Sequence, residues 1–419
     1  MLASARIQGF KSLADVSVEL RPINVLFGPN AAGKSNLIEA LLLLSRLITE
    51  RTVGEALGPP LRGYPVEAFS LPRGGLSELL GTPAVHLEIE GVVRPGEPRG
   101  ARFPLLKYRV GVEMRPGSGE ARVIDEYLGR MTAAGELEKN PRVERVDGGR
   151  LAVRRLQEQG QPRHETLPLH HTVVSNLQFS GEKYPDFDHL RDEVSRWRSY
   201  YLDPAGAMRT AQPPREVDDV GANGEHLAPF LYRLKGGSGT LPAFKAVQRA
   251  LHAALPSVTR LDVDLDPQRG TLDIRLLQNG TEFSSRVVSE GTLRVLTLCA
   301  IAANPFRPSL IALEEPENGV HPRRLEVIAG LLVGIAERGT QVMVTTHSPA
   351  FVAEMLRAQR RAPEKVQLLR CANDRGETSL CPFEDPSPLF ENKKVAEALR
   401  SDDDLQQVQG MLVRGWLDD

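Results

Sequence analysis

The sequence has few cysteines, and they are scattered. Cys299, Cys371 and Cys381 are the only three in 419 residues. An odd, widely spaced set gives neither a disulfide framework nor the C-x-x-C spacing of a thiolate metal site. The sequence therefore excludes a disulfide-stapled fold and is typical of a cytoplasmic protein, in which we expect each cysteine to be a small buried apolar residue.

Long apolar runs and a strong net charge are also absent. The longest apolar run, residues 37–48, is broken by Glu39, Ser45 and Arg46 and is too short to span a membrane. The first residues do not have the pattern of a signal peptide, and no heptad pattern predicts a coiled-coil arm. The net charge of −2 gives no overall signal for nucleic-acid binding. We expect a soluble globular chain that has no membrane partner.

What the sequence does have is a phosphate-binding loop. Residues 28–35 read Gly-Pro-Asn-Ala-Ala-Gly-Lys-Ser, which fits G-x-x-x-x-G-K-[ST]. An apolar, strand-like segment (23–27) precedes the loop, and helix formers (36–44) follow it. Strand, loop and helix together present backbone N–H groups to phosphates, with Lys34 at the β- and γ-phosphates and Ser35 at Mg²⁺. The alternative is a chance glycine turn. The predicted ATP-binding residues are Gly28, Pro29, Asn30, Ala31, Ala32, Gly33, Lys34, Ser35 and Asn36.

A second apolar segment ends in a pair of acids. Residues 309–314 predict an apolar strand that ends in the acids Glu314 and Glu315, and Pro316 and Glu317 come next. In a phosphoryl-transfer site the first acid holds Mg²⁺ and the second polarises the attacking water, so we assign Glu314 to the metal and Glu315 to the water. A strand that ends in ordinary solvated acids is the alternative.

Two more motifs favour a nucleotide site when they are taken with the loop. His347 follows a strand predicted over 340–346 and is placed to hydrogen-bond a γ-phosphate. Ser289 and Gly291 open a helix predicted over 291–303 and would give a second anion-binding helix end. Each has a plain alternative, a structural histidine and an ordinary serine N-cap. The Asn-Gly-x-His-Pro run at 318–322 is, by itself, a turn that leads into a helix.

The remaining sequence predicts a two-part organisation, an ATPase head over 1–50 and 215–419 and an inserted lobe over 51–214. Residues 5–20 predict two strands, and the Pro- and Gly-rich lobe predicts antiparallel strands and hairpins. Beyond 224, helices alternate with apolar strands, which is typical of a mostly parallel sheet. The predicted lobe elements are strands at 84–90, 105–113 and 121–128, hairpins or a mobile segment at 136–170, and a helix at 186–198. The predicted later elements are helices at 224–235, 241–254, 291–303, 322–337 and 349–358, and strands at 258–265, 271–277, 309–314, 340–346, 366–371 and 378–382.

In this order the motifs resemble an ABC-type AAA ATPase head of the RecF/SMC-like branch. The N-terminal run at 7–13, the loop, Ser-x-Gly, Glu-Glu-Pro-Glu, Asn-Gly-x-His-Pro and Thr-Thr-His-Ser-Pro all contribute. The resemblance is close to the ATPase part of OLD-family (overcoming-lysogenization-defect) proteins, without their Toprim domain. It implies an α/β P-loop NTPase fold, with a mixed, mostly parallel sheet flanked by helices, an inserted α+β lobe and antiparallel N-terminal strands.

The resemblance also implies how the residues act. Ser289 and Gly291 of one subunit would contact the γ-phosphate that the other subunit holds, so ATP and Mg²⁺ would join two heads in a homodimer. Glu315 would then act on the water, His347 would sense the γ-phosphate, and residues 318–321 would form the D-loop. Two positions depart from the family, because Glu314 stands where Asp is usual and Thr292 replaces the second glycine of the signature.

The resemblance predicts slow ATP hydrolysis coupled to double-stranded DNA in repair, recombination or phage defence. The alternative is a regulatory ATPase that controls a separate effector nuclease, and a transporter motor is a weaker third. An intrinsic nuclease is not favoured, because Asp402, Asp403 and Asp404 are better explained as a helix start than as a metal site. DNA is implied by the resemblance and not by charge, because each arginine cluster is interleaved with acids or ordinary loops. The clusters are Arg142, Arg145, Arg150, Arg154 and Arg155; Arg191, Arg196 and Arg198; and Arg357, Arg360 and Arg361.

Overall fold

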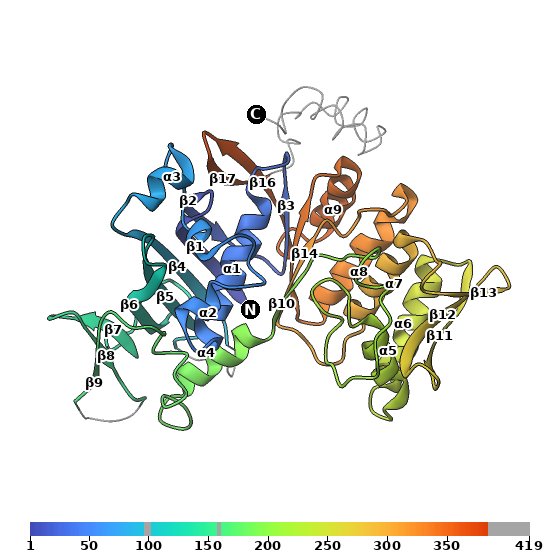
Figure 1. Ribbon diagram of the computed structural model, residues 1–419, viewed down its shortest axis with the longest axis horizontal. Helices are drawn as coiled ribbons and strands as arrows, with labels where there is room; N and C mark the ends of the chain where they lie inside the picture. The colour runs from blue at the N-terminus through green and yellow to red at the C-terminus, as the bar shows by residue number, and fades with distance from the viewer. Residues whose placement is uncertain (96–101, 157–160, 384–419) are drawn as a thin grey trace. The chain divides into compact units, whose positions relative to one another are not determined.

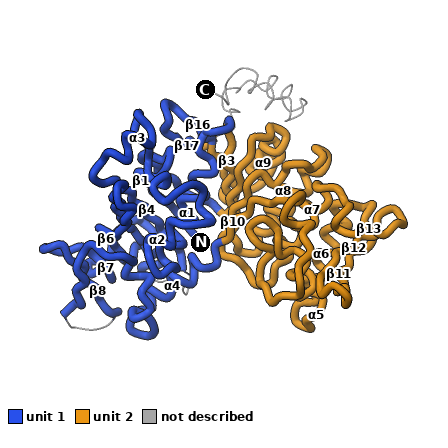
Figure 2. Tube along the Cα trace, in the orientation of Figure 1, with its two compact units in different colours: residues 1–21, 29–197, 370–381 blue, residues 22–28, 198–369, 382–419 orange. Residues whose placement is uncertain are grey.

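The computed structural model describes residues 1–95, 102–156 and 161–383 and divides the chain into two compact units (Figure 2). These units group the chain differently from the predicted head and lobe, and that domain division stays a prediction. Residues 402–404, predicted to start a helix, lie outside the described residues. Unit 1 comprises residues 1–21, 29–197 and 370–381, and unit 2 comprises residues 22–28, 198–369 and 382–419.

Unit 1 is built on an eight-stranded antiparallel sheet in the order β2-β1-β4-β5-β6-β7-β8-β9 (Figure 1). Apolar and polar residues alternate along these strands, so that one face is buried. In β5, Tyr108, Val110 and Val112 are buried, whereas Lys107 and Arg109 are partly exposed. The predicted strands of the lobe are confirmed, and residues 136–170 contain hairpin strands. The bounds are β1 Leu2–Phe10, β2 Leu13–Glu19, β4 Val85–Val93, β5 Leu105–Arg115, β6 Glu120–Met131, β7 Val143–Val146, β8 Arg150–Val153 and β9 Arg163–Thr166.

The first helix of unit 1 follows the phosphate loop. Helix α1 (Lys34–Thr49) buries Leu37, Leu41 and Leu44. The helix predicted over 186–198 is wrong at its end, because α4 (Pro185–Ser195) stops and strand β10 (Trp197–Tyr200) follows. Both terminal aromatic side chains of β10 are buried, so packing of β-prone residues overrides the helical pattern there. The shorter elements are α2 Val53–Ala56, the 3₁₀ turn η1 Pro65–Ala68 and α3 Gly75–Leu80.

A buried carboxyl fixes part of unit 1. Glu126 on β6 accepts hydrogen bonds from the backbone N–H groups of Val173 (2.6 Å) and Val174 (3.0 Å) and from the hydroxyl of Tyr108 (3.0 Å). Burial raises the pKa of the Glu126 carboxyl to about 7, although these hydrogen bonds act in the opposite direction. The contact ties residues 173–174 to the sheet and makes unit 1 sensitive to pH.

Unit 2 carries the core of a six-stranded sheet in the order β10-β14-β15-β3-β16-β17. Strands β14 (Leu310–Glu314), β15 (Gln341–Thr346) and β3 (Ile23–Phe27) run parallel, with Glu314 opposite Thr345 and Thr346 opposite Phe27. Every residue of β3 and β15 is buried, as expected of a parallel sheet covered on both faces. The three strands end level, so Gly28, Glu315 and His347 follow at one sheet edge. Strand β16 (Val366–Asp374) continues into unit 1, where β17 (Glu377–Pro382) begins.

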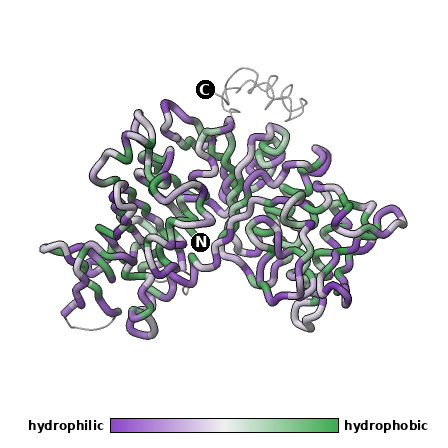
Figure 3. The backbone as a smooth tube through the Cα atoms, viewed as in Figure 1, coloured by the Kyte–Doolittle hydropathy of each residue, from purple (hydrophilic) through white to green (hydrophobic). Residues whose placement is uncertain are grey.

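Five helices and a small antiparallel sheet complete the described part of unit 2. Residues 295–301 of helix α7 (Glu290–Ala302) are all buried, which makes α7 a central helix, and α7 and α8 are rich in apolar residues (Figure 3). No helix in the described ranges combines the length and apolar character that crossing a bilayer requires. The other bounds are α5 Leu227–Gly236, α6 Leu241–Ala254, α8 Leu325–Glu337 after the 3₁₀ turn η2 Pro322–Arg324, α9 Pro349–Arg361, β11 Val258–Asp266, β12 Thr271–Gln278 and β13 Thr281–Ser284.

Candidate functional site

The predicted phosphate loop has the backbone of an anion-binding turn. Gly28 (φ 144°), Ala31 (φ 65°) and Gly33 (φ 88°) all have positive φ, and Ala31 is not a glycine. Such strain in a non-glycine residue is typical of functional sites. Gly33 caps helix α1 without a side chain, and the first turn of α1 holds no acid. The N-terminal N–H groups of α1 are therefore arranged for a phosphate rather than for a side-chain cap.

Lys34 lies over its own loop. Its Nζ donates a hydrogen bond to the carbonyl oxygen of Pro29 at 2.7 Å, and the residue is 7% exposed. A lysine ammonium has three donors and is a usual phosphate ligand. The loop conformation, the start of α1 and the presence of this lysine therefore fit the triphosphate of ATP.

Two hydroxyl groups hold the loop in place, one from strand β17 and one from the turn between β1 and β2. The Thr378 hydroxyl donates to the Ala32 carbonyl oxygen (3.1 Å) and lies 2.7 Å from Ser12 Oγ. Asn36 Nδ2 donates to the same Ser12 oxygen at 2.7 Å. A Cβ at Gly33 would lie 1.9 Å from Thr378 Oγ1, so only glycine fits there. Sequence reasoning did not assign Ser12 or Thr378, and Thr378 lies 346 residues after Ala32 without a local signal.

The predicted catalytic acid of unit 2 is held by two side chains. Glu315 Oε1 lies 2.8 Å from His347 Nδ1, and Asn318 Nδ2 donates to Oε2 at 2.5 Å. Glu315 itself has φ 46°, and its N–H donates to the Thr345 carbonyl at 3.0 Å. The structure therefore brings Glu315, His347 and Asn318 together at the carboxyl edge of the parallel sheet, with the histidine exposed to solvent.

Glu314, the predicted metal residue, ends β14 and is partly exposed. Among the described residues no three His, Cys, Asp or Glu side chains gather into a complete metal site. Mg²⁺ does not need one, because it usually keeps several waters and binds one or two protein oxygens together with substrate phosphates. A carboxylate at Glu314 and a hydroxyl at Ser35 are donors of the kind that Mg²⁺ prefers.

Sequence reasoning left Glu317 without a role, although it is the most buried acid of this motif. Glu317 is 5% exposed, its Oε1 accepts a hydrogen bond from the Thr346 hydroxyl, and its Oε2 is buried without a hydrogen-bond partner. Burial raises the pKa of the Glu317 carboxyl. Its position next to Thr346 places it directly behind His347.

Arg294 on helix α7 is the opposite charge that acts on Glu317. Burial lowers the pKa of Arg294, and Glu317 is the strongest of the acidic groups that act against this shift. Arg294 Nε is buried without a partner, and no ion pair within 4 Å joins Arg294 to Glu317 in the described chain. Each of the two side chains therefore has a buried polar atom without a hydrogen-bond partner, which is costly.

The predicted signature residues form the first turn of α7. Ser289 is the N-cap, and its Oγ accepts the Thr292 N–H at 3.2 Å, so the plain N-cap interpretation holds whatever else Ser289 does. A Cβ on Gly291 would lie 2.4 Å from the carbonyl oxygen of Gly319, so α7 packs closely on the predicted D-loop. His321 caps η2 through Nδ1, which accepts the Arg323 N–H at 3.2 Å.

Six of the eleven arginines in the predicted basic clusters form ion pairs with acids. The pairs are Arg142–Asp186 (2.7 Å), Arg154–Glu144 (2.6 Å), Arg191–Asp188 (2.6 Å), Arg196–Asp192 (3.0 Å), Arg198–Asp218 (4.0 Å) and Arg357–Glu354 (2.8 Å). The positive charge of these six arginines is therefore partly neutralised within the chain.

The strand–loop–helix turn and the parallel strands define a P-loop NTPase. Residues 23–353 match the family described as "AAA domain, putative AbiEii toxin, Type IV TA system". The chain belongs to this family of AAA ATPases, so the predicted recognition is confirmed. It is similar to Old nuclease of Escherichia phage P2, with 24% identity over 401 residues, 89% of this chain and 60% of that protein. The chain thus spans about 60% of the length of this relative.

A solved structure shows the same fold. The crystal structure of an Smc head bound to the C-terminal winged-helix domain of ScpA matches with a TM-score of 0.53 and 13% identity, over 92% of this chain and 99% of that chain. At this identity the likeness shows the fold alone. The predicted fold class, an ABC-type P-loop NTPase head with mixed sheets flanked by helices, is confirmed.

Proposed function

We propose that this protein binds and hydrolyses ATP with Mg²⁺ and that ATP joins two copies head to head. Loop residues 28–36 bind the phosphates through backbone N–H groups and Lys34. Ser35 and Glu314 hold Mg²⁺, directly or through water. The bound metal supplies charge neutralisation at the phosphates. Family membership and the uncapped N-terminus of α1 support the nucleotide part of this proposal.

The observation that carries the hydrolysis proposal is the orientation of Glu315. Its two carboxylate oxygens are fixed by His347 and Asn318 at 2.8 and 2.5 Å, in a residue with a strained backbone. A carboxylate held in this way can accept a proton from an attacking water without first reorienting. His347 lies beside it, and its proposed role is to hydrogen-bond the γ-phosphate when ATP is present.

The dimer proposal depends on the surface around Ser289. Ser289 is exposed at the start of α7, Val287 just before it is 71% exposed, and Tyr201, which acts electrostatically on Arg294, is 63% exposed. Large exposed apolar side chains beside a helix N-terminus fit a surface that another molecule covers. We propose that a second copy covers it, with Ser289 and Gly291 contacting the nucleotide of that copy.

A role with double-stranded DNA, in repair, recombination or phage defence, is proposed from the likeness to Old nuclease and Smc heads. A second candidate is ATP-dependent control of a separate effector nuclease. The similarity to a protein named Old nuclease suggests this candidate. We place the protein in the cytoplasm, in line with its reduced, scattered cysteines.

The first test is the oligomeric state by light scattering with Mg²⁺ and ATP. We expect the wild type and Glu315→Gln to be monomeric without nucleotide, and Glu315→Gln to form a stable dimer with ATP. Ser289→Arg in the same background should prevent the dimer and leave ATP binding intact. A Glu315→Gln protein that binds ATP and stays monomeric would overturn the dimer proposal. Undiminished hydrolysis by Glu315→Gln would overturn the assignment of the catalytic acid.

A further inference from the structure

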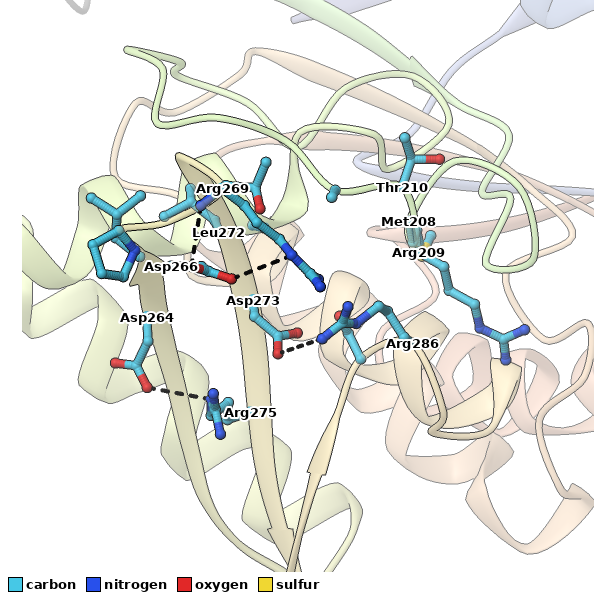
Figure 4. A pocket seen from close by; sticks show the side chains of 16 residues that line it. Met208, Arg209, Thr210, Asp264, Asp266, Arg269, Leu272, Asp273, Arg275 and Arg286 are labelled. Carbon is cyan, nitrogen blue, oxygen red and sulfur yellow. Dashed lines mark hydrogen bonds and ion pairs between the residues drawn. The ribbon is translucent and has the colours of Figure 1, made fainter.

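A second charged cavity lies within unit 2, beside the chain that leads into Ser289. Its volume is about 420 Å³, a size that takes a small molecule. Three segments line it: the β11–β12 hairpin, residues 208–211, and residues 285–286 (Figure 4). The segments are fixed to one another by backbone hydrogen bonds, Leu272 N–H to the Gln212 carbonyl and Ser285 N–H to the Ile274 carbonyl, both at 2.8 Å. The cavity wall is therefore ordered structure.

Four arginines and three aspartates line this cavity, and three of the arginines have acidic partners. The pairs are Arg269–Asp266 (3.8 Å), Arg275–Asp264 (3.6 Å) and Arg286–Asp273 (3.3 Å), drawn with dashed lines in Figure 4. The 3.8 Å pair is longer than a hydrogen bond, so donors of Arg269 remain available. Arg275 is also paired with Glu282 at 2.9 Å, outside the lining, so Arg209, Arg269 and Arg286 are the arginines that matter for an anion.

Arg209 is the lining arginine that lacks an acid. In the described ranges no carboxylate lies within 4 Å of it, its Nη2 donates to the Val288 carbonyl at 2.9 Å, and its Nε is buried without a partner. A guanidinium stays protonated in proteins, so it cannot relieve this desolvation by losing its charge. A partly buried cation without a counter-ion is costly, and an anion in the cavity would supply the missing partner.

We propose that this cavity is a phosphate-binding site in which Arg209 is the principal contact and Arg269 and Arg286 assist. Guanidinium groups bind phosphate oxygens through paired hydrogen bonds, which suits this wall better than a carboxylate or an uncharged ligand. The phosphate comes either from a free phosphorylated small molecule or from the nucleotide that a second copy holds. The second source rests on the dimer proposed above.

The site is connected to the signature turn. Arg209 bonds the carbonyl of Val288, the residue before Ser289, and Arg286 lies two residues earlier in the same segment. A phosphate that draws the Arg209 guanidinium toward the cavity therefore acts on the backbone that carries Ser289. The cavity would regulate the turn that contacts nucleotide.

Binding of a free phosphorylated molecule is tested on the full chain carrying Lys34→Ala, a change that weakens phosphate binding at the loop. Pyrophosphate is titrated into this variant by calorimetry. We expect binding that Arg209→Gln weakens roughly 10- to 100-fold, the range for a hydrogen-bonded charged group. Arg233→Gln is the matched control, because Arg233 also donates to a backbone carbonyl (Val217, 2.6 Å) but lies outside the cavity. It should leave binding unchanged.

Binding to the nucleotide of a second copy is tested in the Glu315→Gln background. There we expect Arg209→Gln to raise the ATP concentration needed for dimerisation by roughly 10- to 100-fold, with Arg233→Gln again unchanged. A response in either titration supports the site and identifies its source, and no response in either overturns it. If the Glu315→Gln parent never dimerises, the dimer proposal fails and the pyrophosphate titration alone decides the site. Should Arg209→Gln not fold, the double variant Arg269→Gln, Arg286→Gln replaces it, and unchanged phosphate binding there overturns the proposal.

Discussion

The phosphate loop of unit 1 and the acid cluster of unit 2 are held in different ways. The loop has a strained backbone and is held by hydrogen bonds of the Thr378 and Ser12 hydroxyl groups and the Asn36 amide. The acid cluster contains Glu317 and Arg294, two partly desolvated charges with unsatisfied atoms. The loop is therefore preformed for binding, whereas the cluster keeps buried polar atoms that have no hydrogen-bond partner.

The largest effect is expected in the acid cluster. Glu315→Gln should lower kcat roughly 100- to 10,000-fold, because proton transfer by a positioned side chain contributes about that much. The dissociation constant for ATP should change little. Steady-state hydrolysis and equilibrium binding measure the two quantities. Asn318→Ala, which removes one support of the same carboxylate, should give a smaller loss, and an equal loss would contradict the assignment of Glu315 as the base.

The preformed loop predicts that Gly33 cannot be replaced. Gly33→Ala forces a side chain at φ 88° and against Thr378 Oγ1. Strain and overpacking together should cost about 3 kcal/mol in unfolding free energy and abolish measurable ATP binding. Denaturant unfolding and calorimetry check both results. Thr378→Ala in the same chain removes the contacting atom and should recover part of the stability; the absence of any recovery would show that the clash is not the cause.

Unit 1 should lose stability as pH rises through the range in which Glu126 titrates. The folded-state pKa of Glu126, about 7, lies above the ordinary glutamate value of 4.5. The folded state then binds more protons than the unfolded state between these values, so stability falls with rising pH, by about 3 kcal/mol in total. Glu126→Gln should remove most of this slope between pH 4.5 and 7 in chemical denaturation. A slope that persists in the variant would assign the pH dependence to other groups.

The smallest expected effect concerns the hydrogen bonds of the Thr378 hydroxyl group to the phosphate loop. Thr378→Val keeps the shape of the side chain and removes its hydrogen bonds to Ala32 and Ser12. We expect a loss of about 1 kcal/mol, seen as roughly fivefold weaker ATP binding. Thr281→Val, on the exposed edge strand β13 of unit 2 and outside the cavity, is the control. Unchanged binding in Thr378→Val would mean that backbone strain alone fixes the loop.

Local patterns predicted the elements that carry the motifs. An apolar run before Gly28 gave β3, helix formers after Ser35 gave α1, and apolar runs before Glu314 and His347 gave β14 and β15. In each case the predicted functional residue comes directly after a buried segment. Its place in the sequence therefore also predicts its place at the edge of the sheet. Elements of four to six residues, among them α2, α3 and β13, were missed because they are too short to show a period.

The supporting residues could not be predicted because they are distant in sequence. Thr378 meets Ala32 across 346 residues, and Arg209 meets Val288 across 79. Arg294 and Glu317 are ordinary charged residues in the sequence, and only their burial makes them unusual. Packing decides such roles, and no local pattern reports it.

The close approach of Gly291 to Gly319 has a kinetic consequence. Because no side chain separates the first turn of α7 from that carbonyl, the signature turn and the segment that carries Asn318 cannot move independently. In a dimer in which each signature turn contacts the ATP of the other copy, ATP binding at one site would shift the signature turn there. That shift would change the position of Asn318, and so of the catalytic acid, at the other site. Hydrolysis by such a dimer would be positively cooperative in ATP.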